Sequence, residues 1–346
     1  MKERIKSLDG LKGIACLLIA FFYHYFPLDC EIRHLGTRLV EVFFAISGFG
    51  FAYVYKDIIS QKSFSEWFFK RYLKIMPLYW ITFICCLIIQ LYSVKIKGET
   101  TDNIAIDFLH IFWGFVGIES GWIINASPVN GPSWFVSTLF LCYILYFLIC
   151  KCNKKFYFLL LVSLLLFSSC GILLQWQYPF LYFEASLRGY ASFCMGALMY
   201  EVYKKLSSKG GAILAYSLII IYAVYVTVLN NIGSFKGEQL TGEMRLLIIF
   251  FFIPTIFLSI LYIPLIKMFL ETKVIQKIAN IAMEIYLWHY SVEIVVAFTS
   301  IHETWLGYGI VIITTLIISF LSHKILNPQK TSKFLMSYIN DNFIKK

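Results

Sequence analysis

The sequence has few charged residues. Only 14% of its 346 residues are Asp, Glu, Lys or Arg, whereas 59% are hydrophobic, and the mean hydropathy is +0.73. About a quarter of the residues of a typical soluble globular protein are charged. A chain of this length cannot bury so much apolar surface in one water-soluble core. The composition therefore excludes a soluble globular protein and predicts a protein whose surface is largely solvated by lipid.

Two further features are missing, a cleavable signal peptide and a metal-binding motif. The first apolar run, 13–27, has no small-residue cleavage site and is followed by further apolar runs. Nine cysteines are present, mostly inside apolar runs; Cys150 and Cys152 resemble half of a metal knuckle, but no matching Cys/His pair lies nearby. We therefore predict no metal site and interpret the cysteines as small apolar side chains.

Long hydrophobic runs dominate the chain. A helix needs about 20 mostly apolar residues to cross a bilayer, and ten stretches approach this length: 11–28, 36–55, 75–93, 133–150, 156–174, 187–203, 211–229, 246–266, 279–299 and 305–325. They predict an all-α, polytopic membrane protein with one integral-membrane domain over 1–346 and no separate soluble domain. The stretch 105–118 is shorter and contains Asp107 and His110, so we expect an interfacial or re-entrant helix there.

The distribution of basic residues gives the ten spans a direction. With the N-terminus in the cytoplasm, only seven of the 30 basic residues fall in the outer segments: Arg33, Arg38, Lys95, Lys97, Arg188, Lys236 and Arg245. Cytoplasmic loops carry an excess of Lys and Arg, so this bias predicts that both termini are cytoplasmic. The net charge of +10 is then explained by membrane orientation, and we expect no nucleic-acid partner.

Ionisable residues within the spans are candidates for function, because an ionisable group in lipid is costly. The informative ones are His24, Glu41, Arg188 with Glu184 at the start of the same span, His289 and Glu293. His24 and His289 each lie twelve residues beyond a cytoplasmic lysine, about 18 Å along a helix, so we expect them at similar depth. His289 and Glu293 share one helix face. Three alternative interpretations stay open: that each histidine fixes helix packing by a hydrogen bond, that the Glu41 and Arg188 side chains form a structural ion pair, and that Glu293 only orients His289.

Six segments, in order, carry a family resemblance. They are LDGLKGIACLLIAFFYH (8–24), VEVFFAISGF (40–49), KRYLKIMPLYW (70–80), GPSWFVSTLFLCY (131–143), RGYASFCMGAL (188–198) and IYLWHY (285–290). Each motif alone is weak, but their order on a ten-span chain resembles the membrane acyltransferase-3 family, which is typified by bacterial multi-pass O-acyltransferases of surface glycans.

Two positions depart from the family pattern. The family has a basic residue, ten residues and then a histidine in the first span, whereas eleven residues separate Lys12 from His24. This extra residue rotates the pair to about 120° apart on an ideal helix, so either a π-bulge absorbs one residue or Lys12 precedes the regular helix. Many members also carry Trp-Ser-Leu-x-x-Glu in a middle span, but no glutamate follows Trp134 here.

The resemblance implies transfer of an acyl group, usually acetyl, from cytoplasmic acyl-coenzyme A to a hydroxyl of an extracytoplasmic or lipid-linked glycan. Lys12, Arg71 and Lys74 are the candidates that hold the phosphates of acetyl-CoA. His24 is the candidate catalytic base, with Glu41 orienting its ring. His289, Arg188 and Glu293 are supporting residues. Direct transfer and transfer through an acyl-histidine are both open.

The main alternative function is a glycan exporter or flippase, because ten helices with charges inside the membrane fit that class too. Against it, we find no inverted repeat or matching pair of Gly/Pro-broken spans. A non-catalytic membrane sensor or assembly subunit is a third alternative. The expected location is the plasma or inner membrane, with membrane lipid, acyl-CoA and a glycan or glycolipid acceptor as partners. The sequence predicts neither the acceptor nor the oligomeric state.

Overall fold

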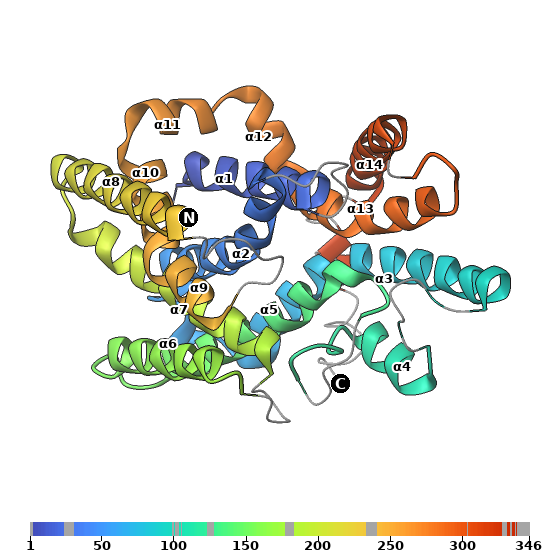
Figure 1. Ribbon diagram of the computed structural model, residues 1–346. Coiled ribbons are helices and arrows are strands. Elements are labelled where there is room, and N and C mark those ends of the chain that lie inside the picture. The colour runs from blue at the N-terminus through green and yellow to red at the C-terminus, as the bar shows by residue number, and fades with distance from the viewer. Residues whose placement is uncertain are drawn as a thin grey trace.

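The computed structural model describes residues 3–23, 31–98, 106–122, 128–176, 183–232, 241–302 and 304–326, together with residues 100 and 104 and five residues between 331 and 337. Within this part of the chain every regular element is a helix and there is no strand (Figure 1). The prediction of an all-α fold is confirmed.

Each of the ten apolar stretches contains a helix. These helices are α1 (Lys6–Leu17) with η1 (Leu18–Tyr23), α2 (Glu31–Tyr55), α3 (Phe64–Lys97), α5 (Trp134–Lys151), α6 (Tyr157–Leu173), α7 (Glu184–Lys205), α8 (Ser208–Ile232), α9 (Gly242–Leu247) with η5 (Ile248–Phe252) and α10 (Ile253–Tyr262), α13 (Ala282–Ala297) and α14 (Trp305–Leu326). Shorter elements connect them: η2 (Ile59–Gln61), α4 (Phe108–Val116), η4 (Gly131–Ser133), α11 (Pro264–Leu270) and α12 (Lys273–Asn280).

Six helical segments are long and apolar enough to cross a membrane, namely Arg38–Tyr55, Phe64–Ile96, Gly131–Lys151, Ser208–Tyr225, Gly242–Tyr262 and Trp305–Leu326. The remaining four stretches fall short for different reasons. Helices α6 and α13 have only 17 and 16 residues. Helix α1 and the continuous η1 are long enough together but contain Lys6, Asp9 and Lys12, and α7 carries charged residues at both ends. The structure thus supports a multi-pass membrane protein, while ten spans and cytoplasmic termini stay predictions.

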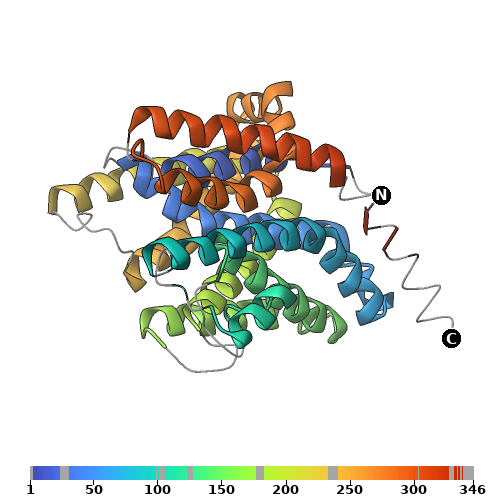
Figure 2. The ribbon, with the colours of Figure 1, turned by 90° about the vertical axis from the view of Figure 1, so that its right-hand side faces the viewer.

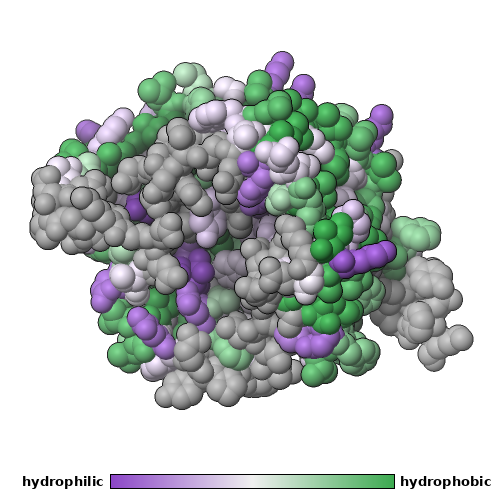
Figure 3. Space-filling model, turned by 45° about the vertical axis from the view of Figure 1, so that its right-hand side comes forward, coloured by the Kyte–Doolittle hydropathy of each residue, from purple (hydrophilic) through white to green (hydrophobic). Residues whose placement is uncertain are grey.

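Burial separates the central helices from the peripheral ones. In the segment containing α5, 78% of the residues are buried inside the protein, against 11% in the α8 segment and 22% in α14. The exposed residues of α8 and α14 are mostly large and apolar, Ile220 and Phe320 among them. Figure 3 shows hydrophobic residues covering broad areas of one face. Such faces suit contact with lipid tails, because they present little that water could solvate.

Helix α4 lies in the stretch 105–118 and does not cross a bilayer. It has nine residues, about 14 Å of helix, whereas the hydrocarbon core is about 30 Å thick. The Tyr72 hydroxyl donates to Val116 O at 2.9 Å and Trp80 Nε1 donates to Phe115 O at 2.8 Å. These bonds hold the end of α4 against α3 well before the end of that long helix, so the chain folds back along α3 (Figure 1), as expected for a re-entrant segment.

At one end of the helix bundle, the first turns of some helices lie close to the last turns of others. Arg4 donates to Asn280 Oδ1 at 3.2 Å, Gln276 Nε2 donates to Lys6 O at 2.8 Å, and Tyr53 Oη donates to Glu3 O at 2.7 Å. We call this end, formed by residues 3–12, 53–55, 276–284 and 323 together with Lys74, the terminal face. Figure 2 shows α3 and α14 running lengthwise across the molecule, and α14 reaches the terminal face with its last turns.

Helices α2 and α7 pack with their backbones in direct contact. A Cβ atom added at Gly48 would meet Phe193 O at 1.9 Å, and one added at Gly196 would meet Ala45 O at 1.9 Å. Only residues without a side chain allow such an approach, as in small-residue interfaces between membrane helices. This contact fixes the relative register of α2 and α7.

We therefore expect Gly48→Leu or Gly196→Leu to force these helices apart. Overpacking typically costs about 1–3 kcal/mol, and displacement of backbone should put these variants at or above the upper end. Thermal unfolding of the detergent-purified protein measures the loss. Gly50→Leu is the matched control, because nothing lies within 4 Å of a Cβ atom at Gly50. Equal stability of all three variants would contradict the packing account.

Candidate active site

The segment between Lys12 and His24 contains a π-helix. Lys12 lies inside the regular helix α1, and η1 follows over Leu18–Tyr23. A π-helical turn accommodates one extra residue within a helix. The first explanation of the eleven-residue spacing is thus confirmed, and the alternative that Lys12 precedes the regular helix is wrong. His24 itself lies outside the described residues.

Tyr23, the last residue of η1 and the one before His24, shows toward which helices η1 extends. Tyr23 packs so closely on α2 that a Cβ atom added at Gly36 would meet Tyr23 Cβ at 2.4 Å. The Tyr23 phenol also interacts electrostatically with Arg188 and with Tyr286. The end of η1 therefore points toward the region where α2, α7 and α13 come together.

Two of the predicted donor-site lysines meet at the terminal face. Lys12 from α1 and Lys74 from α3 interact electrostatically with each other and with Arg4. Arg4 forms an ion pair with Asp9, and Asp9 also interacts with both lysines, which offsets part of the repulsion. The result is a cluster of like charges at one end of an apolar protein, an arrangement that favours binding of an anion.

Arg71 has a different environment. Its Cζ atom lies 4.1 Å from the ring centroid of Tyr55 and 4.1 Å from that of Trp67, and its Nη1 donates to Trp67 O. Aromatic faces attract a guanidinium in this way, and they fix its orientation. The buried Nε has no hydrogen-bond partner among the described residues. Arg71 is thus held rigidly one turn before Lys74.

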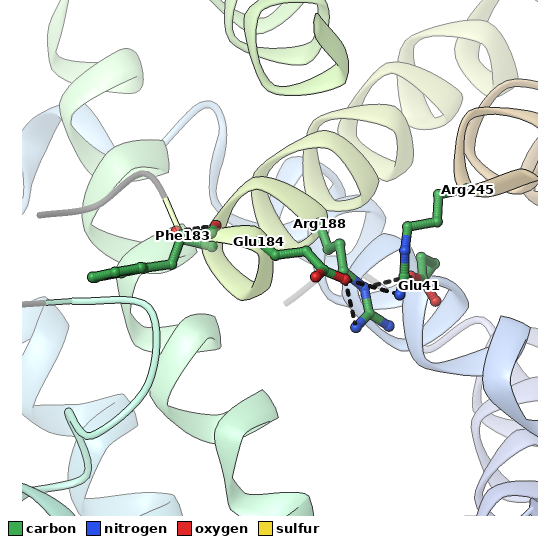
Figure 4. Close-up of polar contacts among 6 residues, drawn as sticks. Glu41, Phe183, Glu184, Arg188 and Arg245 are labelled. Atoms are coloured by element: carbon green, nitrogen blue, oxygen red, sulfur yellow. Dashed lines mark hydrogen bonds and ion pairs between the residues drawn. The ribbon is translucent and has the colours of Figure 1, made fainter. Parts of the chain in front are cut away.

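The second cluster joins α2, α7 and α9 (Figure 4). Arg188 Nε donates to Glu41 Oε1 at 2.8 Å, and Arg245 Nη1 reaches the same oxygen at 3.3 Å. Arg245 Nη2 lies 2.8 Å from Glu184 Oε1. Glu41 is only 1% exposed, whereas Glu184 is 47% exposed. Two carboxylates and two guanidiniums thereby balance their charges at the edge of the buried interior.

Arg188 also contacts an aromatic ring. Its Cζ lies 4.8 Å from the ring centroid of Trp134, the first residue of α5. The predicted residues Glu41 and Arg188 are therefore brought together, as the sequence suggested, and Trp134 joins them. Arg245 was not predicted as a site residue. The signal was present in the sequence, since Arg245, like Arg188, is a basic residue at the predicted outer end of a predicted span.

His289 and Glu293 both lie on α13, one helical turn apart, as predicted. The His289 side chain is fully buried, its Nδ1 lies 3.2 Å from Ile285 O, and its ring lies 5.9 Å from that of Tyr286. A proton on Nδ1 would donate to that carbonyl and leave Nε2 as an acceptor. The structure thus places His289 next to Tyr286, within the same interior.

The short turn η4 connects these groups. Tyr286 Oη donates to Pro132 O at 3.0 Å, and Asn130 Nδ2 donates to Leu287 O at 3.1 Å. Both bonds fasten the segment that enters α5 onto α13. Since Trp134 follows η4 directly, the turn links the Glu41–Arg188 pair on one side with Tyr286 and His289 on the other.

A buried glutamate on the other side of η4 was missed by the sequence analysis. Glu119 is 1% exposed, and its Oε1 lies 2.6 Å from Ser133 Oγ and 2.9 Å from Tyr79 Oη. The available signal was a single acidic residue inside the apolar stretch 111–122.

A further pair, Glu284 and His323 at 2.6 Å, joins α13 to α14 at the terminal face. The sequence analysis had assigned no role to His323.

Comparison with known proteins supplies the family. A family model described as an acyltransferase domain matches residues 5–324, nearly the whole chain. No curated protein and no solved structure gives a significant match. The match includes α1, the lysine cluster, the Glu41–Arg188 pair and α13, all on one multi-pass helical body. The chain belongs to the acyltransferase-3 family of membrane acyltransferases.

Proposed function

We propose that this protein transfers an acyl group, most simply acetyl, from cytoplasmic acyl-coenzyme A to a hydroxyl of an extracytoplasmic or lipid-linked glycan. The observation that carries the proposal is that the family match spans both a basic cluster and a separate polar interior, with α1 and η1 leading from one to the other. The proposed location is the plasma or inner membrane, with the terminal face in the cytoplasm.

Donor binding is assigned to the basic cluster. Coenzyme A carries several phosphate charges, and Lys12 and Lys74 offer ammonium groups from two helices. Arg71, oriented by Tyr55 and Trp67, contributes a fixed positive charge beside them. The pantetheine arm is long and thin, and in this proposal it extends between the helices so that the thioester reaches His24.

Transfer is assigned to the polar interior. His24 in its neutral form removes a proton from the acceptor hydroxyl, whose oxygen then attacks the thioester carbonyl carbon, and the coenzyme A thiolate leaves. In the other route the His24 nitrogen attacks first, and the acyl group passes from it to the hydroxyl. Glu41, Arg188 and His289 shape the site in both routes, with Glu293 supporting His289.

The first test is His24→Ala. Loss of a general base costs about 10²–10⁴-fold in rate, so acylation of the glycan should fall by that factor, whereas the amount of inserted protein should not. Mass spectrometry of surface glycans and membrane fractionation measure the two quantities. Unchanged acylation in a variant that inserts normally would remove His24 from the reaction.

The donor assignment predicts a change in KM. Lys74→Gln should raise the KM for acetyl-CoA about two- to fivefold, the usual range for one partly solvated ionic contact, and the difference should shrink at high salt. Lys62→Gln is the control, because Lys62 is an exposed lysine in the loop that precedes α3. A fall in kcat with an unchanged KM would contradict donor binding at Lys74.

The Glu41–Arg188 pair allows the functional and structural explanations to be separated. Arg188→Gln should destabilise the protein by about 1–3 kcal/mol, because it removes the closest partner of a buried carboxylate while Arg245 keeps its longer contact with the same oxygen. Adding Glu41→Gln should restore part of the thermal stability but none of the acyl transfer. If transfer recovers together with stability, the pair is structural only.

A further inference from the structure

The buried carboxyl group of Glu119 is used by neither donor binding nor transfer, yet it lies where three segments meet. Its partners are Tyr79 of α3 and Ser133 of η4, and Tyr79 in turn bonds the carbonyl of Gly114 in the last turn of α4. We call these four residues the Glu119 cluster. All three of its side chains are 1% exposed or less.

The hydrogens of this cluster can be counted. Tyr79 Oη lies 2.7 Å from Gly114 O and 2.9 Å from Glu119 Oε1, and a phenol has one hydrogen to donate. The Gly114 carbonyl can only accept, so the 2.7 Å contact requires the Tyr79 hydrogen. An ionised Glu119 is also only an acceptor, and its contact with Tyr79 would then set lone pairs against each other.

A proton on Glu119 resolves the conflict. Glu119 Oε1–H donates to Tyr79 Oη, Tyr79 donates to Gly114 O, and Ser133 Oγ donates to Glu119 Oε1. Each hydrogen then has one acceptor and each contact has one hydrogen. Burial acts in the same direction, because it raises the pKa of Glu119 to about 7.

From this geometry we propose that Glu119 is a protonated carboxyl group that positions η4, and through η4 the neighbouring Trp134 and Tyr286. Ser133 ends η4 and precedes Trp134, and Pro132 O accepts the Tyr286 hydrogen bond. Ionisation of Glu119 breaks its bond to Tyr79 and leaves a charge within the cluster. The titratable groups that face it are Tyr79 and Cys86 from α3 and His110 from α4.

The sign of the pH dependence follows from linkage. The pKa of Glu119 in the folded protein lies above its ordinary value, so the folded state binds the proton more tightly than the unfolded state. Its contribution to stability is complete below the ordinary pKa and is lost as the pH rises toward about 7. The side chain of Glu119→Gln is neutral at every pH, so the stability of this variant should not show this fall between the ordinary pKa and about 7.

Infrared difference spectroscopy of the full-length protein tests the protonation directly. The carbonyl band of a protonated carboxylic acid should be present at pH 6, fade with a midpoint near 7, and be absent from Glu119→Gln. Glu66→Gln is the control, because Glu66 is an exposed carboxylate at the start of α3. Spectra of the wild type that show no such band at pH 6 would overturn the proposal.

Tyr79→Phe tests the direction of the hydrogen bond and covers the case in which Glu119→Gln does not fold. If Glu119 donates to Tyr79, removal of this acceptor disfavours the protonated form and lowers the midpoint by about one pH unit. A higher midpoint would mean that Tyr79 donates to an ionised Glu119, and would overturn the proposal. Neither measurement uses acyl transfer, so failure here is distinguishable from failure of the proposed function.

Discussion

The contact between α2 and α7 is the constraint on which the interior depends. Gly48 and Gly196 bring the two backbones together, and this approach sets Glu41 of one helix 2.8 Å from Arg188 of the other. A carboxylate that is 1% exposed in an apolar protein needs such a partner, because an unpaired buried charge costs several kcal/mol. The close packing of α2 on α7 therefore also provides the partner that the buried Glu41 needs.

The polar groups of the interior extend from this pair. Arg188 lies over Trp134, Trp134 begins the helix that η4 introduces, and η4 receives the hydrogen bond of Tyr286. Glu41, Arg188 and Tyr286 each contact a group from another element, so few of these groups can move independently. This rigidity suits a site that must orient a hydroxyl and a thioester.

The basic cluster at the terminal face is built differently. Lys74 and Arg4 are exposed and Lys12 is half-buried. The three basic groups repel each other, and the ion pair of Arg4 with Asp9 offsets part of this repulsion. An arrangement of this kind leaves positive potential available to a ligand, whereas the four charges around Glu41 balance each other. In the proposed function the first region holds the anionic donor and the second encloses the transfer.

Features that depend on residues close together in the sequence could be predicted from it, whereas features that depend on contacts between distant segments could not. Hydropathy is local, so the helices and the shortness of the segment 105–118 could be predicted. Helical register is also local. The spacing of Lys12 and His24 suggested a π-bulge as one of two explanations, and η1 is a π-helix in that segment. The ion pair of Glu41 with Arg188 was anticipated as one of the alternatives that the sequence left open. Arg245 was not, because its role depends on how α9 packs on α2 and α7.

Other features depend on tertiary contacts that no pattern encodes. The aromatic rings around Arg71 include that of Tyr55, at the end of α2. The Glu119 cluster depends on the return of the chain along α3. Glu119 was not predicted as a site residue, because its burial comes from that fold-back. His24, the residue that the resemblance makes most important, lies outside the described residues, so its role continues to be a prediction from the motif.

The central claim is that the donor binds at the terminal face and the acyl group leaves from the opposite side of the membrane. Sealed vesicles of known orientation, identified by a tag on the N-terminus, test it with membrane-impermeant labelled acetyl-CoA. Label should reach the glycan only when acetyl-CoA is on the side that carries the tag. Incorporation only from the opposite side, or equally from both sides, would contradict the account.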